Sequence, residues 1–155
     1  QLAVRGPTGI TYWNRPEKQK EVIEDGWSYP GDIFVQREDG RFEYQSRQDD
    51  LIISSGYNIP GPEVEMVLEE RDEVQEVAVI GAPDEERGEI VKAYIVLAED
   101  VEESDALITE LQDYVKNTLA PYKYPRAIQF INELPRTETG KIQRTHLRER
   151  EQPAS

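Results

Sequence analysis

The stretch LPRTETGKIQR, residues 134–144, places a lysine directly after a glycine in a segment with hardly any apolar side chains. Such a segment is not suited to a hydrophobic core, so we expect it to form an exposed loop. A lysine ammonium on a flexible stem suits oxygens that carry negative charge, above all in a partly dry cleft. From the loop alone, this role for Lys141 and an ordinary solvated lysine both remain open.

The composition restricts the chemistry of the rest of the chain. The 155 residues include 18 basic and 32 acidic side chains, and the net charge of −14 would repel a nucleic-acid backbone. Cysteine is absent and His146 is the single histidine, which argues against a disulfide framework and against a thiolate or histidine metal cluster. We therefore expect neither a nucleic-acid partner nor a metal site in this chain.

Targeting signals are also missing from the sequence. No apolar run approaches the roughly 20 residues that a membrane helix needs, and the segment QLAVRGPTGI lacks the layout of a signal peptide. We expect a cytoplasmic protein without a membrane span. The acidic residues are spread along the chain, and only six of the 18 basic residues are lysine. This composition fits either a halophilic source or an ordinary acidic bacterial protein.

Residues 1–46 predict β-rich structure with one short helix that begins at Pro16. Asp39-Gly40 predicts a tight hairpin, because glycine accepts the positive φ that such turns need. Apolar residues alternate on both sides of this turn: Ile33, Val35, Phe42 and Tyr44. The charged junction RQDD, residues 47–50, then separates this part from a different pattern over residues 51–150, and residues 151–155 predict a frayed tail.

Residues 51–150 predict alternating strands and helices. The strands are expected over 51–54, 74–83, 89–99 and 126–134, the turns over 56–58 and 84–88, and the helices over 60–72, 104–119 and 144–151. Ser104 is placed to cap the middle helix, whose apolar stripe should cover the sheet: Leu107, Ile108, Leu111, Tyr114 and Val115. This order predicts an α+β domain, with a mixed sheet covered by helices and a two-stranded hairpin.

Four segments together resemble the closing third of the adenylate-forming enzymes, specifically the acyl-CoA synthetases: GWSYPGD, RQDDLIISSGYNIPGPEVE, RGEIVKAYIVL and LPRTETGKIQR. Within that family, RGPTG, DDLIISSGYNIPGPEVE and LAPYKYPRAI look most like the benzoate, 2-aminobenzoate and medium-chain acyl-CoA ligases. The resemblance implies that a carboxylate attacks the α-phosphate of ATP to give an acyl-adenylate and pyrophosphate. A CoA thiol then displaces AMP, after a rotation of the C-terminal domain.

The family keeps its phosphate loop and acyl pocket in a large N-terminal domain. The resemblance therefore implies that this chain is an inactive C-terminal fragment, with residues 1–46 as the β-rich end of the N-terminal domain. Residues 47–50 would be the hinge and residues 51–150 the mobile C-terminal domain. That N-terminal domain would be the partner of this chain and would hold the Mg²⁺ that accompanies ATP.

The resemblance also implies roles in the first step. Lys141 matches the catalytic lysine that stabilises charge at the α-phosphate, and Gly140 lets the loop approach the nucleotide. Asp32 and Arg47 match nucleotide-binding residues, although a turn aspartate and a surface ion pair with the neighbouring aspartates would explain them without the family. Asp49 matches the hinge position.

In the second step, the resemblance implies that the SSGYN turn with Gly56 and Tyr57 lines the path of pantetheine, although a plain hairpin glycine would look the same. Lys116 and Arg126 are similar to bases that meet the CoA phosphates. Two alternatives stay open, namely an adenylation domain that loads a carrier protein and a non-catalytic interaction module. We expect His146 on a surface helix, and Trp13 and Trp27 as packing residues.

Overall fold

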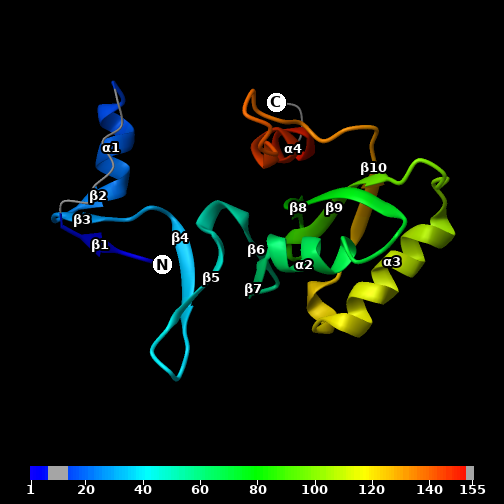
Figure 1. Ribbon diagram of the computed structural model, residues 1–155, viewed down its shortest axis with the longest axis horizontal. Coiled ribbons are helices and arrows are strands. Elements are labelled where there is room, and N and C mark those ends of the chain that lie inside the picture. Colours follow the sequence, from blue (N-terminus) through cyan, green and yellow to red (C-terminus); the bar gives the residue numbers. More distant parts are fainter. Residues whose placement is uncertain (7–13, 153–155) are drawn as a thin grey trace. The chain divides into compact units, whose positions relative to one another are not determined.

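The computed structural model describes residues 1–6 and 14–152, and the chain divides into two compact units, Gln1–Asp49 and Asp50–Ser155 (Figure 1). Trp13 and most of the RGPTG segment lie outside the described residues, as does the end of the predicted tail. None of the helices in the described part of the chain has both the length and the apolar character that a membrane crossing requires.

Unit 1 consists of short strands and one short helix. Its elements are β1 (Val4–Arg5), α1 (Pro16–Val22), β2 (Ile23–Glu24), β3 (Trp27–Ser28), β4 (Asp32–Gln36), β5 (Phe42–Arg47) and η1 (Gln48–Asp50), which ends at the first residue of unit 2. The strands of the first sheet lie in the order β1-β3-β2. Trp27, which we predicted to pack, is 38 % exposed, and the Arg5 guanidinium lies 5.7 Å from its ring. Strands of two residues give too small a sheet to bury an indole.

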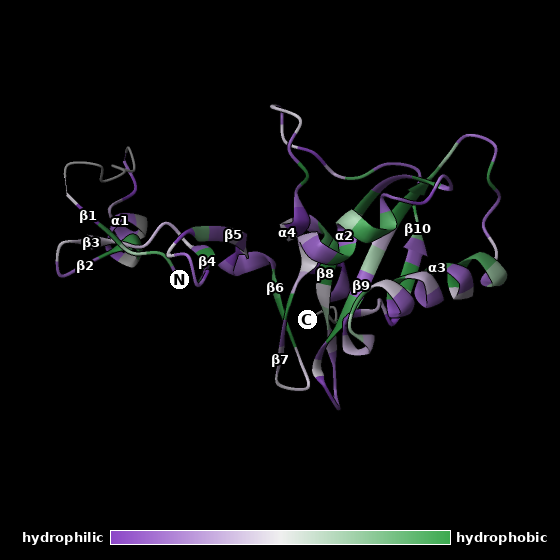
Figure 2. Cartoon of the chain, turned by 60° about the horizontal axis from the view of Figure 1, so that its bottom comes forward, coloured by the Kyte–Doolittle hydropathy of each residue, from purple (hydrophilic) through white to green (hydrophobic). Residues whose placement is uncertain are grey.

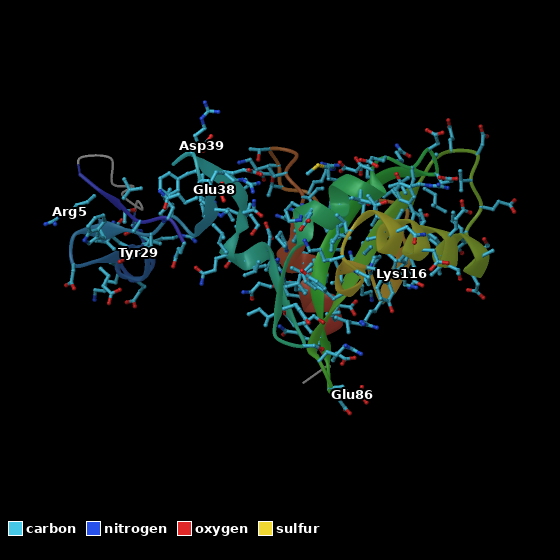
Figure 3. All side chains as sticks on the ribbon, turned by 90° about the horizontal axis from the view of Figure 1, so that it is seen from below. Arg5, Tyr29, Glu38, Asp39, Glu86 and Lys116 are labelled. Carbon is cyan, nitrogen blue, oxygen red and sulfur yellow. The ribbon has the colours of Figure 1, made fainter. Side chains whose placement is uncertain are left out.

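The predicted hairpin at Asp39-Gly40 is confirmed, since β4 and β5 pair in antiparallel register. Gly40 has a φ of +80°, and Asp39, labelled near the tip in Figure 3, accepts a hydrogen bond from the backbone of Arg41. A bulge after Ile33 shifts the register, so Phe34 lies opposite Tyr44 with their rings 5.6 Å apart. The alternating apolar pattern of the sequence, which starts at Ile33, does not indicate this bulge.

Unit 2 is an α+β domain, as predicted. Its elements are β6 (Leu51–Ser54), β7 (Tyr57–Pro60), α2 (Gly61–Leu68), β8 (Val74–Asp84), β9 (Gly88–Leu97), α3 (Asp105–Thr118), η2 (Pro121–Lys123), β10 (Ala127–Phe130) and α4 (Arg144–Glu151). The sheet is mixed, because β10 runs parallel to β9 while β8 and β6 pair with β9 in antiparallel register. β7 continues the sheet as the partner of β6.

Alternation along β8 gives this sheet two covered faces. Val77 and Val79 join the core that also contains residues of α2 and α3, whereas Ala78 and Ile80 belong to a second buried cluster with Leu147 of α4 on the other face. Figure 1 shows α3 and α4 on different sides of the strands. α4 is coloured mostly hydrophilic in Figure 2, so a single buried leucine and several polar contacts hold it.

Three predicted boundaries were wrong. The turn lies at Ser55-Gly56, not over 56–58, because both residues have positive φ, +49° and +81°, which is the geometry of a two-residue hairpin. Residues 57–60 consequently form β7, a strand that the sequence pattern did not indicate. The helix predicted over 60–72 ends at Leu68, and the strand predicted over 126–134 is limited to β10. Ser104 caps α3 as predicted, by accepting from the Leu107 amide at 3.2 Å.

Candidate functional site

Lys141 lies in a tight turn between β10 and α4. Thr137 closes the turn: its amide donates to the Lys141 carbonyl (2.8 Å), its carbonyl accepts from Gly140 (2.9 Å), and its hydroxyl accepts from the Lys141 amide (3.1 Å). Gly140 has a φ of +83°, and no atom lies within 4 Å of the position that a Cβ would occupy. The backbone conformation, not crowding, therefore requires glycine at this position.

The stem of this turn is fixed while the lysine side chain is open to solvent. Arg136 pairs with Ile142 in an isolated bridge, and its guanidinium donates to the Gly140 carbonyl (2.7 Å) and to the Glu76 carboxylate on β8. Lys141 is exposed, and its ammonium forms no hydrogen bond or ion pair with the residues that the structure describes. An ammonium held in this way is available to an external anion.

A buried carboxylate fixes the chain directly after the Lys141 turn. Glu65 of α2 is only 7 % exposed, and it accepts from the Val79 amide (2.7 Å) and from two nitrogens of Arg144, the closest at 2.7 Å. Burial of a carboxylate is costly unless donors satisfy it, and a bidentate guanidinium provides two of them. The start of α4 is thus tied to both α2 and β8.

The rest of α4 is held by two further polar contacts. Arg148 donates to Asp50 (2.9 Å), the residue after the predicted hinge position, and Lys92 of β9 donates to Glu151 (2.6 Å). Tyr94 is buried, which together with its hydrogen bond to Glu151 raises the pKa of its phenol far above the ordinary value. Burial alone would raise the pKa of Glu151, but donation from Lys92 and Tyr94 outweighs burial and lowers it.

The two predicted nucleotide-binding residues face each other in unit 1. Asp32 opens β4 and Arg47 closes β5, and the strand register places them opposite one another. Their side chains form an ion pair, with 3.3 Å between Arg47 Nε and Asp32 Oδ1. Arg47 therefore pairs with Asp32, and both side chains remain partly exposed (53 % and 27 %) and able to accept further partners.

The predicted pantetheine turn SSGYN, residues 54–58, carries an aromatic contact that the sequence did not reveal. Tyr57 stacks on Tyr122 of η2, with 4.3 Å between the ring centroids and 19° between the planes. Both rings are exposed, at 52 % and 39 %. Two tyrosines on the segment APYKYP, between two prolines, were the available signal for this aromatic surface.

Lys116 and Arg126, the predicted CoA-phosphate residues, meet at one tyrosine. The Lys116 ammonium lies 4.3 Å and the Arg126 guanidinium carbon 4.9 Å from the centroid of the Tyr124 ring. Arg126 also donates to the Tyr124 hydroxyl (2.9 Å), and Lys116, labelled on α3 in Figure 3, pairs with Asp113 (3.1 Å). Two cations thus flank one ring, two residues after Tyr122.

The predicted residues therefore form pairs within the units. Asp32 joins Arg47 in unit 1, and Lys116 joins Arg126 in unit 2. Asp49, in η1, is the last residue of unit 1. His146 is exposed on α4. Among residues 1–6 and 14–152, no group of three or more His, Cys, Asp or Glu side chains could hold a metal ion.

Comparison with known families identifies the family of this chain. Residues 63–141 match the family of the AMP-binding enzyme C-terminal domain. The chain belongs to this family. The match includes Lys116, Arg126 and Lys141, while the other predicted site residues precede it.

This chain is similar to several acyl-CoA ligases. The long-chain-fatty-acid–CoA ligase of Bacillus subtilis (strain 168) is 44 % identical over 97 % of this chain and 27 % of the ligase. The solved anthranilate CoA ligase AuaEII, in complex with anthranoyl-AMP, has a TM-score of 0.83 and 38 % identity over 96 % of this chain and 29 % of its own. An ATP-bound RpMatB-BxBclM chimera has a TM-score of 0.80 and 37 % identity over 90 % of this chain and 28 % of its own.

These comparisons confirm the predicted acyl-CoA synthetase relationship and the α+β fold. The family binds ATP, as the ATP-bound chimera illustrates. The chain spans about a quarter of the length of these relatives. The roles of the individual site residues remain predictions.

Proposed function

We propose that this chain is the C-terminal part of an AMP-forming acyl-CoA ligase and that it supplies Lys141 to the first step. In that step a carboxylate oxygen bonds to the α-phosphorus of ATP and pyrophosphate leaves. The observation that carries the proposal is the Lys141 turn, with its fixed stem and open ammonium, in a member of this family. Such a cation meets the charge that develops on the phosphate oxygens.

Asp32 and Arg47 would contact the nucleotide in this ligase. A carboxylate has two acceptor oxygens for the ribose hydroxyls, and the ion pair with Arg47 orients it. Asp49 would be the hinge within residues 47–50, between a β-rich segment 1–46 and a mobile domain 51–150. Mg²⁺ would bind with ATP on residues of the large N-terminal domain. A cytoplasmic location remains part of the proposal.

In the second step, the CoA sulfur bonds to the acyl carbon and AMP leaves. Gly56 and Tyr57 would line the path of the pantetheine arm, and the cations Lys116 and Arg126 would meet the CoA phosphates. The exposed Tyr57–Tyr122 stack supports the first assignment, because aromatic rings offer apolar surface to a ligand. The two cations at the Tyr124 ring support the second, because cations bind phosphates. We propose CoA and not a carrier protein as the acyl acceptor, since these relatives are CoA ligases.

Separate assays of the fragment and the whole enzyme test this function. The term complete ligase here means this chain together with the N-terminal part of the same enzyme, as its relatives have it. With ATP and a carboxylic acid, the complete ligase should release pyrophosphate, and with CoA it should form acyl-CoA. The 155-residue chain alone, with benzoate or octanoate, should release none. Pyrophosphate release by the chain alone, or acyl transfer by the complete ligase to a carrier protein but not to CoA, would contradict the proposal.

A further inference from the structure

Two turns from different hairpins lie side by side at one edge of unit 2. The β6–β7 turn contains Ser55 and Gly56, and the β8–β9 turn precedes Gly88. Ser54 lies opposite Gly88 in the sheet register, the Ser55 amide donates to the Arg87 carbonyl (3.0 Å), and the Arg87 guanidinium donates to the Ser55 hydroxyl (3.0 Å). The first turn is therefore bound to the second by backbone and side chain.

Glu89 makes a third contact with the β6–β7 hairpin. Its Oε2 accepts a hydrogen bond from the Ile53 amide at 2.8 Å. To reach this amide the side chain crosses Gly81 of β8, where a Cβ would lie only 2.7 Å from the Glu89 carboxylate. Gly81 has no positive φ, so its backbone conformation does not require glycine. Glycine is needed here because a side chain would occupy the space of the Glu89 carboxylate. Any side chain at position 81 would displace the Glu89 carboxylate.

The β8–β9 turn is itself held in shape. Asp84 accepts hydrogen bonds from the amides of Glu86 (3.1 Å) and Arg87 (2.9 Å) with the same oxygen. Figure 3 shows Glu86 projecting into solvent from this end of the hairpin. A well-ordered turn of this kind can act as a support for its neighbour.

Ser55 needs such a support. Its φ of +49° lies in the left-handed region, which costs a residue with a Cβ about 1 kcal/mol. Its neighbours must therefore favour this conformation. The contacts from Arg87 provide that restraint on one side, and Glu89 fixes the strand residue two positions before Ser55.

We infer that Arg87 and Glu89 are positioning residues that hold the Ser55-Gly56 turn in the shape needed for acyl transfer to CoA, with Gly81 reserved as space for Glu89. The inference rests on the proposed role of this turn in the second step. Neither side chain is expected to touch CoA or the adenylate. Loss of either should slow thioester formation and leave adenylate formation unchanged.

Single-turnover assays of the two half-reactions in the complete ligase test this inference. Arg87→Ala, Glu89→Ala and Gly81→Ala should each slow acyl transfer from pre-made acyl-adenylate to CoA about tenfold or more, because small misplacements cost large factors in rate. Glu89→Gln keeps an acceptor oxygen for the Ile53 amide and should restore most of the rate. Glu86→Ala, an exposed change on the same turn, is the matched control.

A further variant separates this inference from the proposed function. Gly56→Val alters the turn itself and should block acyl transfer selectively. If Gly56→Val is selective but Arg87→Ala and Glu89→Ala are not, the positioning role is wrong and the function of the turn stands. If Gly56→Val impairs both steps equally, the proposed role of the turn fails, and the inference fails with it. Glu89→Gln and Arg87→Ala decide the matter if Gly81→Ala does not fold.

Discussion

The Lys141 turn and the Ser55-Gly56 turn use the same backbone device in different surroundings. Both contain a glycine in the left-handed region, with φ values of +83° and +81°. The Lys141 turn is fixed at its stem and its ammonium is open to solvent. The Ser55-Gly56 turn is bound along its side by a neighbouring turn, and the adjacent Tyr57 ring is stacked on Tyr122.

The difference fits two kinds of task. A cation that meets charge on a nucleotide needs a fixed base and a mobile side chain, because the side chain adjusts to the phosphate as the reaction proceeds. A turn that lines the path of a thiol arm needs a fixed shape, because its backbone is the contact surface. The comparison predicts that changes in the two turns affect different steps of the reaction.

Removal of the Lys141 ammonium should have the largest effect. Lys141→Ala should slow adenylate formation in the complete ligase about a thousandfold, which corresponds to about 4 kcal/mol of lost transition-state stabilisation. Acyl transfer from pre-made acyl-adenylate to CoA should stay close to normal. Single-turnover assays measure each step, and Lys20→Ala, which removes an exposed lysine of α1, is the matched control. Equal losses in both steps would remove the contrast between the two turns.

The contacts that fix the stem of the Lys141 turn and the chain directly after it can be compared by their effect on stability. Glu65→Ala should lower the free energy of unfolding of the 155-residue chain by about 3 kcal/mol, because Arg144 loses its buried carboxylate partner. Arg136→Ala removes a pair with Glu76 in which the side chains are 40 % and 36 % exposed, and it should cost at most about 1 kcal/mol. Urea unfolding measures both values. Similar values for the two variants would show that the buried pair is not the main anchor.

A change at the predicted hinge should reverse the pattern seen with Lys141. Asp49→Pro restricts φ, so it should hinder the rotation between the two steps and slow acyl transfer to CoA about a hundredfold. Adenylate formation should remain near normal. Asp49→Asn leaves φ unrestricted and serves as the control. If both substitutions leave acyl transfer unchanged, the hinge lies elsewhere.

The smallest expected effect concerns the far end of α4. The pKa of Glu151 lies below its ordinary value, so the carboxylate contributes stability above about pH 4.5, and this contribution is lost as the pH falls through the lowered pKa. Glu151→Gln should reduce the free energy of unfolding by about 1 kcal/mol at neutral pH. The difference between wild type and variant should shrink toward pH 3. A difference that is independent of pH would show that charge on Glu151 is not involved.

Local features of this chain were predictable because local physics determines them. The Ser104 cap, the apolar stripe of α3 and the hairpin turn at Asp39-Gly40 each depend on residues within a few positions of one another. Lys141 was recognisable because its turn is contained in one segment, and Arg136 to Ile142 close it. The family resemblance added roles that composition and spacing alone left open.

Contacts between distant segments could not be predicted. Tyr57 and Tyr122 stack across 65 positions, and Glu89 reaches Ile53 across Gly81 only because three strands are brought together. β7 was missed because Ser55 adopts a left-handed conformation that its residue type does not favour. Tertiary contacts decide such cases, and single-sequence patterns do not contain them.

The contacts of α4 also determine when unit 2 is completed during synthesis. Arg144 pairs with Glu65 at a separation of 79 positions, and Arg148 pairs with Asp50 at a separation of 98. Until the ribosome has made α4, the Glu65 carboxylate lacks its guanidinium and the site of Leu147 is open to water. Chains that stop before Arg144 would keep both defects permanently, and such chains are natural targets for chaperones and proteases.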